Sequence, residues 1–120
     1  MRSLLVVAIG GILGATARWG VAELFDTPAD GFPWPTLVVN IVGCLLVGVA
    51  ARRIPRHSDA WLGAVVGVLG GLTTFSAFAN ETRILFDQGH SAMAVTYVAV
   101  TLVAGLGATE LALGDERTPA

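Results

Sequence analysis

Uncharged residues are gathered in three long stretches of this 120-residue chain. No charged side chain occurs in residues 31–51, 60–80 or 91–109, and each stretch is about 20 residues long. An α-helix rises 1.5 Å per residue, so about 20 residues cross a hydrocarbon layer of about 30 Å. The pattern therefore predicts three membrane-spanning helices.

A fourth stretch lies at the N-terminus, where residues 3–17 are uncharged. It is long enough to span a membrane if the side chain of Arg18 reaches the lipid headgroups. A cleavable signal peptide is the alternative, with Arg2 as its positive start, Leu4 to Leu13 as its apolar segment and Ala15 to Ala17 as a small-residue cleavage site. We expect a fourth span and keep the signal peptide as an open alternative.

The fold class follows from the backbone's need for hydrogen bonds. In lipid only helices and closed barrels satisfy every peptide group. The uncharged stretches do not alternate strictly and are about twice as long as a membrane strand requires. We predict an all-α integral membrane protein with one domain, residues 1–113, a polar tail, 114–120, and four spans at about 3–22, 35–53, 60–80 and 91–112. The third connection is expected to run from Glu81 to His90.

Composition narrows the function classes. The chain is 54% apolar and 13% charged, whereas a soluble domain has about 25% charged residues. The seven basic residues are scattered arginines, which does not indicate nucleic-acid binding. Cys44 is the only cysteine and is expected to be a small packing residue, while His57 and His90 fall in predicted loops without metal-ligand spacing. We expect no catalysis.

The third stretch carries adjacent glycines and several hydroxyls at its centre, from Gly70 to Ser76. This composition predicts a helix that is broken in mid-membrane. A break frees carbonyl and amide groups, which are tolerated there only if protein, water or an ion binds them. Free carbonyl oxygens suit a hard cation such as Na⁺.

Several uncharged hydrogen-bond donors point instead to a small anion. Asn40 places an amide inside the second stretch, and Phe75 and Phe78 are spaced so that their positively polarised ring edges face the same way. Asn40 bonding to a neighbouring helix, and the two rings contacting lipid or core, remain open alternatives. From these residues alone, an anion path and simple helix packing are both consistent.

Two further helix faces are regular. Gly10, Gly14 and Arg18 recur every four residues and predict close approach of another helix. On the fourth stretch, polar and small residues also recur every four positions, at Tyr97, Thr101, Gly105 and Thr109. That stripe is expected either to line a pore or to pack.

Three segments resemble the signatures of the Fluc (CrcB) family of fluoride channels. They are Gly10-Gly-Ile-Leu-Gly-Ala-Thr-Ala-Arg18-Trp19, Pro35-Thr36-Leu-Val-Val-Asn40-Ile-Val-Gly43 and Gly70-Gly-Leu-Thr-Thr-Phe-Ser-Ala-Phe78, with Glu81 following. The resemblance implies a multi-pass cell-membrane protein that forms an antiparallel dual-topology dimer. It further implies a fluoride-specific channel that exports F⁻ passively, lowers its toxicity and is stabilised by a structural Na⁺.

The resemblance also implies roles for single positions. The carbonyls of Gly70 and Thr73 would bind Na⁺, and Arg18, Glu81 and Thr36 would lie at pore mouths or serve structure. The residues implied to line the fluoride path are Asn40, Phe75, Phe78, Ser76, Thr74, Tyr97 and Thr101.

The chain departs from the family pattern in two respects. Gly105 stands where a hydroxyl is expected, so that end of the fourth-helix stripe is expected to hold water, or Thr109 to substitute. Five arginines are expected at one membrane face and at most two at the other, which favours one orientation. The partner is therefore expected to be an identical subunit or an oppositely oriented paralogue.

Two other functions remain as alternatives. A small multidrug transporter needs an ionisable carboxylate inside the membrane, and we expect Glu23 and Glu81 to lie at or beyond helix ends. A non-transporting membrane scaffold would need only the small-residue faces.

Overall fold

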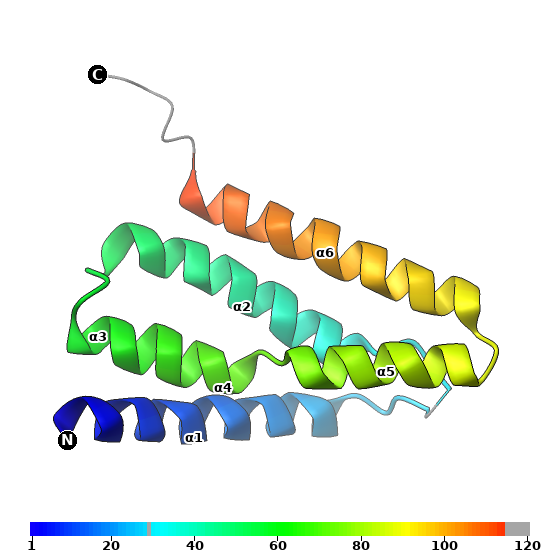
Figure 1. The fold of residues 1–120 in the computed structure, drawn as a ribbon, viewed down its shortest axis with the longest axis horizontal. Helices are drawn as coiled ribbons and strands as arrows, with labels where there is room; N and C mark the ends of the chain where they lie inside the picture. The colour runs from blue at the N-terminus through cyan, green and yellow to red at the C-terminus, as the bar shows by residue number, and fades with distance from the viewer. Residues whose placement is uncertain (29, 115–120) are drawn as a thin grey trace.

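The computed structural model describes residues 1–28 and 30–114, which form helices joined by short connections (Figure 1). Within these residues, four helical stretches are long and apolar enough to cross a membrane, which agrees with the predicted number of spans. Most of the predicted tail lies outside the described residues. The elements are α1 (Arg2–Leu24), α2 (Trp34–Arg53), α3 (Asp59–Trp61), η1 (Leu62–Leu69), α4 (Gly70–Leu72), α5 (Phe75–Asp87) and α6 (Ser91–Leu113).

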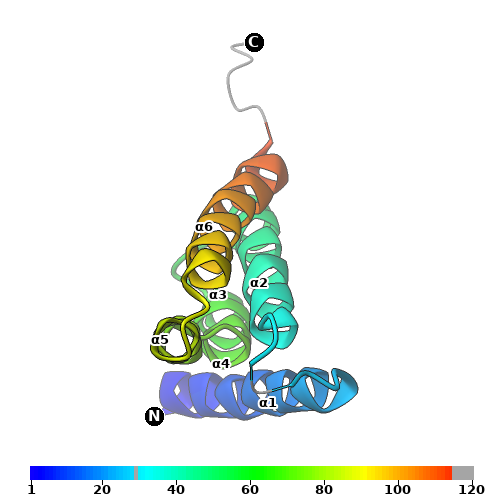
Figure 2. The same ribbon diagram turned by 90° about the vertical axis from the view of Figure 1, so that its right-hand side faces the viewer.

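The helices form a flat assembly of 49 × 40 × 21 Å (Figures 1 and 2). α1 packs mainly on η1 and α4, and α2 packs mainly on α6. Between 11% and 33% of the most apolar window of each span is buried. A small core is formed by Leu37, Leu85, Ala94 and Tyr97. Most apolar side chains therefore face outward, as expected for a protein surrounded by lipid.

The contact between α1 and the third span depends on glycine. Gly10 and Gly14 are the buried residues of α1. A β-carbon added at Gly14 would lie 2.0 Å from the carbonyl oxygen of Val68, and one at Gly10 would lie 2.5 Å from that of Gly63. No side chain fits at these distances, so the predicted close approach of this face is confirmed.

The helix of the third span is wide along η1, an eight-residue π-helix. At its end, the Gly70 N–H donates to the Val65 carbonyl, five residues earlier. Gly63, Gly67 and Gly71 all lie against α1, and β-carbons added to them would meet atoms of that helix within 3 Å. The glycines therefore let two helix backbones touch along most of this segment.

Thr73 and Thr74 connect α4 to α5 with extended backbone. Thr73 has ψ 155°, and Thr74 has φ −149° and ψ 123°. Thr74 also caps the next helix, because its Oγ1 accepts a hydrogen bond of 3.1 Å from the Ala77 N–H. The two threonines thus mark the point where the chain of the third span changes from one helix to another.

The connection between α5 and α6 is shorter than the predicted loop from Glu81 to His90. α5 continues to Asp87 and leaves residues 88–90 as the connection. Leu85 is buried on one face of the added turns, and Arg83 pairs with Asp87 one turn later on an exposed face. The charged residues of this segment lie on the exposed face, so they do not prevent it from being helical. The helix ends near Gly89, which has φ 80°.

Candidate functional site

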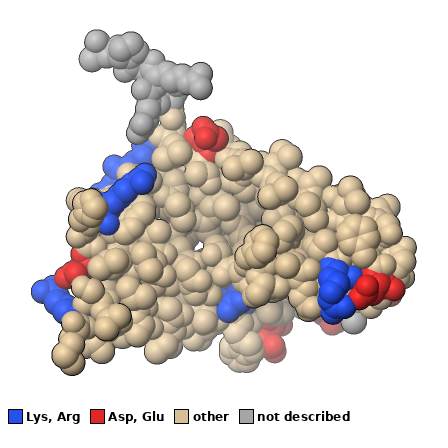
Figure 3. Space-filling model, viewed as in Figure 1, with Lys and Arg blue, Asp and Glu red and all other residues tan. Residues whose placement is uncertain are grey.

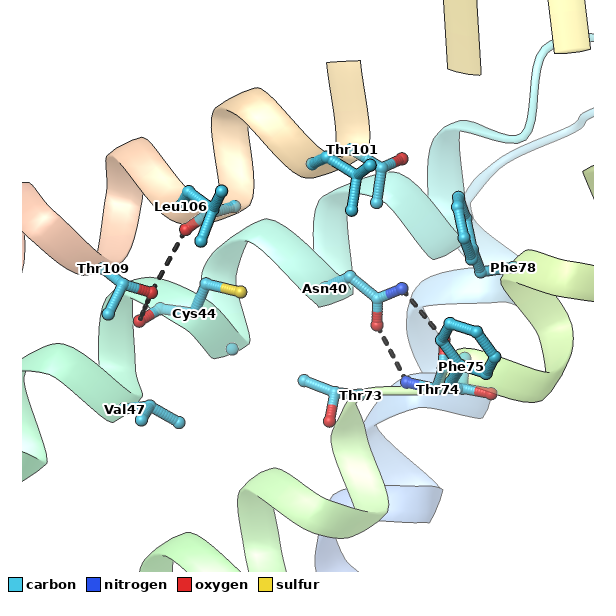
Figure 4. Close-up of a pocket in the computed structure, with 13 residues that line it drawn as sticks. Asn40, Cys44, Val47, Thr73, Thr74, Phe75, Phe78, Thr101, Leu106 and Thr109 are labelled. Carbon is cyan, nitrogen blue, oxygen red and sulfur yellow. Dashed lines mark hydrogen bonds between the residues drawn. The ribbon is translucent and has the colours of Figure 1, made fainter. Parts of the chain in front are cut away.

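Asn40 of α2 holds the extended segment of the third span with its side-chain amide. Its Nδ2 donates to the Thr74 carbonyl at 3.0 Å, and its Oδ1 accepts from the Thr74 N–H at 2.8 Å (Figure 4). Such a reciprocal pair replaces the bonds that a continuous helix would give to Thr74. The amide has a second N–H that is not used in this pair.

A cavity of about 420 Å³ lies beside this pair, between α2, α6 and the start of α5. Figure 3 shows the molecular surface hollowed near its middle. The wall is mostly apolar with a few polar groups, a composition typical of a ligand site. Its lining residues in Figure 4 include Asn40, Cys44, Thr73, Thr74, Phe75, Phe78, Thr101 and Thr109.

Thr101 lines this cavity and carries a buried hydroxyl. Among the buried side-chain oxygen and nitrogen atoms of the described part of the chain, Thr101 Oγ1 is the one without a hydrogen-bond partner. Four other threonines donate to the carbonyl four residues earlier, namely Thr73, Thr82, Thr96 and Thr109. Thr101 makes no such bond, which leaves a donor for a water molecule or an ion.

Phe75 and Phe78 begin a row of aromatic rings at the cavity. Their ring centroids are 5.8 Å apart, and Phe78 is followed by Tyr97 at 5.2 Å. Phe75 is 79% exposed, whereas Tyr97 is fully buried. The row therefore runs from the open side of the cavity into the core.

Ser76 lies near the cavity without lining it. Its Oγ is 3.2 Å from Thr74 Oγ1, and its residue is exposed. The proposed pore residues Asn40, Thr74, Phe75, Phe78 and Thr101 are thus brought to one cavity, while Ser76 stands beside it.

Tyr97 belongs to a second polar cluster, centred on Glu81. Thr36 Oγ1 donates to Glu81 Oε1 at 2.7 Å, and the Tyr97 hydroxyl donates to Glu81 Oε2 at 2.7 Å. Each carboxylate oxygen therefore has a hydroxyl partner from a different helix, α2 or α6. This arrangement ties α5 to both neighbours through one side chain.

The expectation that Glu81 lies at or beyond a helix end is wrong. Glu81 is inside α5, which begins at Phe75 and ends at Asp87. The prediction placed the helix end at residue 80, where the charge-free window ends. The helix continues beyond it because the hydroxyls of Thr36 and Tyr97 satisfy the Glu81 carboxylate by hydrogen bonds. An absence of carboxylates therefore no longer argues against a proton-coupled transporter.

A second cavity, of about 300 Å³, adjoins Glu81. It lies between α5 and the connection from α1 to α2, which supplies Thr27, Pro28 and Gly31 to its wall. Arg18 lines neither of the two cavities. Of the three residues expected at pore mouths or in structural roles, Thr36 and Glu81 are hydrogen-bonded to each other.

The far end of the first cavity contains contacts that the sequence did not reveal. Thr109 Oγ1 donates to the Gly105 carbonyl at 3.1 Å and to the Cys44 carbonyl on α2 at 3.2 Å (Figure 4). A β-carbon at Gly105 would lie 3.3 Å from Cys44 Sγ. Cys44 was expected only to pack, and its place on the cavity wall depends on how α2 and α6 meet.

The backbone at the start of α5 also bears on cation binding. In a continuous helix, the Thr74 N–H would bond to Gly70 and the Ala77 N–H to Thr73. Here these donors go to Asn40 Oδ1 and to Thr74 Oγ1. Among residues 1–28 and 30–114, no cluster of His, Cys, Asp and Glu could hold a metal ion.

Comparison with known proteins gives consistent matches. The family model described as "CrcB-like protein, Camphor Resistance (CrcB)" matches residues 5–113. "Fluoride-specific ion channel FluC 2" of Streptomyces avermitilis is 46% identical over 81% of this chain. The chain spans 64% of the length of that relative.

Two other relatives are covered more fully. "Fluoride-specific ion channel FluC 1" of Streptomyces coelicolor is 44% identical over 93% of this chain and 75% of its own length. "Fluoride-specific ion channel FluC" of Bordetella petrii is 44% identical over 94% of this chain and 90% of its own length.

Proposed function

The chain belongs to the CrcB family of fluoride-specific ion channels, and on that premise we propose that it conducts F⁻ along the cavity beside Asn40. It is a multi-pass cell-membrane protein, and its family consists of channels rather than enzymes. The observation that supports the proposed path is the buried hydroxyl of Thr101, which has no hydrogen-bond partner within the described residues and belongs to a residue of the cavity wall. A desolvated anion would accept its hydrogen bond.

The chemistry of the wall fits a small anion. Asn40 keeps one N–H free of its pairing with Thr74, and the rings of Phe75 and Phe78 offer positively polarised edges. These donors carry no formal charge, so they can replace the water around F⁻ without holding it too tightly for release. In this proposal, selectivity over Cl⁻ would come from donors spaced for the smaller ion.

The Glu81 cluster would stand at one end of this path. Tyr97 contacts Phe78 and also donates to Glu81, so the aromatic row connects the cavity to the carboxylate. Thr36 supplies the second hydroxyl. Both hydroxyls already donate hydrogen bonds to the Glu81 carboxylate, so an arriving anion has to compete with Glu81 for these donors.

A structural Na⁺ is part of the proposal, bound by the carbonyls of Gly70 and Thr73. Support comes from the diversion of the N–H groups of Thr74 and Ala77 to side-chain oxygens, and from the exposure of Gly70. Bound Na⁺ would supply a fixed positive field near the anion path. Hard cations bind about six oxygens, so two carbonyls need a second subunit to complete the shell.

The second subunit is proposed to lie antiparallel, so that two third spans meet at their interruptions in mid-membrane. The flat shape of the single chain and the exposed ring of Phe75 support such a partner. Dual insertion requires balanced arginines, which this chain lacks. An oppositely oriented paralogue is therefore an alternative to an identical subunit, and the numbered names of the two Streptomyces relatives are compatible with it.

Thr101→Val tests the path, because valine has nearly the shape of threonine without the hydroxyl. Liposomes with purified protein are loaded with fluoride, and efflux is read with a fluoride electrode beside a chloride control. We expect rapid fluoride-selective efflux that falls at least about tenfold in Thr101→Val. The matched control is Thr96→Val on the same helix, since Thr96 is exposed and bonds its own backbone.

Either of two results would contradict the proposal. Thr101→Val with wild-type flux would exclude its hydroxyl from the path. Absence of fluoride efflux from a chain that crosslinks as a dimer would contradict conduction by this subunit pair. Passive export that lowers fluoride toxicity is tested separately, by growth of cells in fluoride with and without the chain.

A further inference from the structure

Three arginines lie close together in sequence where α2 ends, and they form a cluster of Arg52, Arg53 and Arg56. All three residues are exposed. In Figure 3, arginine atoms (blue) are gathered at the end of the molecule where α2 finishes. In a bilayer this end of the spans lies among the lipid headgroups.

Contacts with neighbouring residues position Arg52 and Arg56 of this cluster. Arg56 lies over the ring of Trp61, with its guanidinium carbon 5.7 Å from the ring centroid. The turn between them is fixed by Ser58, whose N–H bonds to the Pro55 carbonyl at 3.0 Å and whose hydroxyl caps Trp61. Arg52 donates to the Ala112 carbonyl at 3.4 Å. The cluster is thus built on two helix ends and an ordered turn.

The described acidic groups nearby do not neutralise the cluster. Asp59, the acid on the adjacent turn, is paired with Arg2 at 3.1 Å. Within residues 1–28 and 30–114, the recorded ion pairs are this one and Arg83–Asp87 at the other end of the molecule. Glu110 is exposed on α6 one turn before its end. Within the described ranges, no ion pair or side-chain hydrogen bond engages the guanidinium groups of Arg53 and Arg56.

We propose that Arg52, Arg53 and Arg56, with Trp61, bind the phosphate of an anionic phospholipid headgroup. A guanidinium donates two parallel hydrogen bonds to phosphate, and juxtamembrane arginines add about 1 kcal/mol each to the attraction for anionic lipid. Tryptophan favours the same depth, because its ring is apolar and its N–H is polar. This site is separate from the ion path and independent of it.

Detergent solution provides the cleanest test, because micelles do not have two separate membrane sides. The orientation of the chain in a membrane therefore cannot affect the result. Native mass spectrometry would count retained phosphatidylglycerol on the wild type and on Arg53→Gln/Arg56→Gln. We expect the double variant to bind about 25-fold more weakly, or about fivefold for each arginine. Phosphatidylcholine and inorganic phosphate, tested in parallel, should bind neither protein measurably.

Two control variants separate the site from general charge. Arg83→Gln removes an exposed arginine at the other end of the molecule and should leave phosphatidylglycerol binding unchanged. Arg53→Lys/Arg56→Lys keeps the charge and should recover part of the affinity. Equal binding by the wild type and the double variant would overturn the proposal, as would an equal loss in Arg83→Gln. Tight binding of free phosphate would identify an anion site rather than a lipid site.

Discussion

The two halves of the third span are held by different interactions, although they belong to one crossing of the membrane. The first half, η1 and α4, touches α1 through glycines, and its buried residues are Gly67 and Leu69. The second half, α5, is tied to α2 and α6 by Thr36, Glu81 and Tyr97. Asn40 holds the junction between the halves.

We expect this difference to separate residues that stabilise the fold from residues that support the proposed conduction. Glycine packing gives a contact with no spare donors, because backbone meets backbone at van der Waals distance. Side-chain hydrogen bonds leave unused donors and gaps, and the larger cavity opens beside them. We therefore expect substitutions in the first half to affect folding most and substitutions around the junction to affect ion flux most.

The largest effect is expected for Gly14→Ala. The added β-carbon would lie 2.0 Å from the Val68 carbonyl oxygen, so α1 would have to move away from η1. We expect the free energy of unfolding to fall by about 3 kcal/mol or more. A lower thermal unfolding midpoint and a lower yield of monodisperse protein would report this loss. Gly11→Ala is the control, because its β-carbon would meet nothing within 4 Å. Similar behaviour of the two variants would contradict the packing argument.

Asn40→Ala should have the next largest effect. It leaves the Thr74 N–H and carbonyl without their partner, at a cost of about 1–3 kcal/mol for a buried polar group. Fluoride efflux should fall by more than about tenfold, while Val42→Ala, an exposed position on the same helix, should conduct normally. Asn40→Ala with full flux would show that the junction and the path are independent.

A smaller effect is expected at the Glu81 cluster. Thr36→Val and Tyr97→Phe each remove one hydroxyl from the carboxylate, and each should cost about 1–2 kcal/mol. Because both act through Glu81, a double-mutant cycle read by thermal unfolding should give a coupling above about 0.5 kcal/mol. Strict additivity would mean that the two hydroxyls do not share one partner.

Gly105→Ala should have the smallest effect. Its β-carbon would lie 3.3 Å from Cys44 Sγ and would narrow the far end of the larger cavity without blocking it. We expect fluoride efflux to change by about twofold or less, because no donor is lost. Gly107→Ala, which meets nothing within 4 Å, is the matched control. A complete loss of flux would place the narrowest point of the path at Gly105.

The halves also differ in how far they could be predicted. The spacing of Gly10 and Gly14 predicts a close helix contact, because small residues on one face have few other uses in a membrane. The position of Glu81 inside α5 could not be read from a charge-free window. Its carboxylate is held by Thr36 and Tyr97, which are 45 and 16 residues away in the chain.

Roles at the junction were only partly visible in the sequence. Asn40 was expected to need a partner, but both a helix and a solute fitted that need. The structure gives it Thr74, 34 residues away. The position of Cys44 on the cavity wall depends on the contact between α2 and α6, including the bond from Thr109 to the Cys44 carbonyl. No local sequence pattern indicates such long-range contacts.

Fluoride efflux through Asn40→Asp tests the central claim most directly. Aspartate can still accept from the Thr74 N–H, but when ionised it has no donor for an anion and adds a negative charge beside the cavity. If crosslinking and size-exclusion chromatography show that the variant keeps the oligomeric state of the wild type, we predict that liposome efflux falls by at least about a hundredfold. Fluoride efflux at the wild-type rate would contradict an anion path along this side chain.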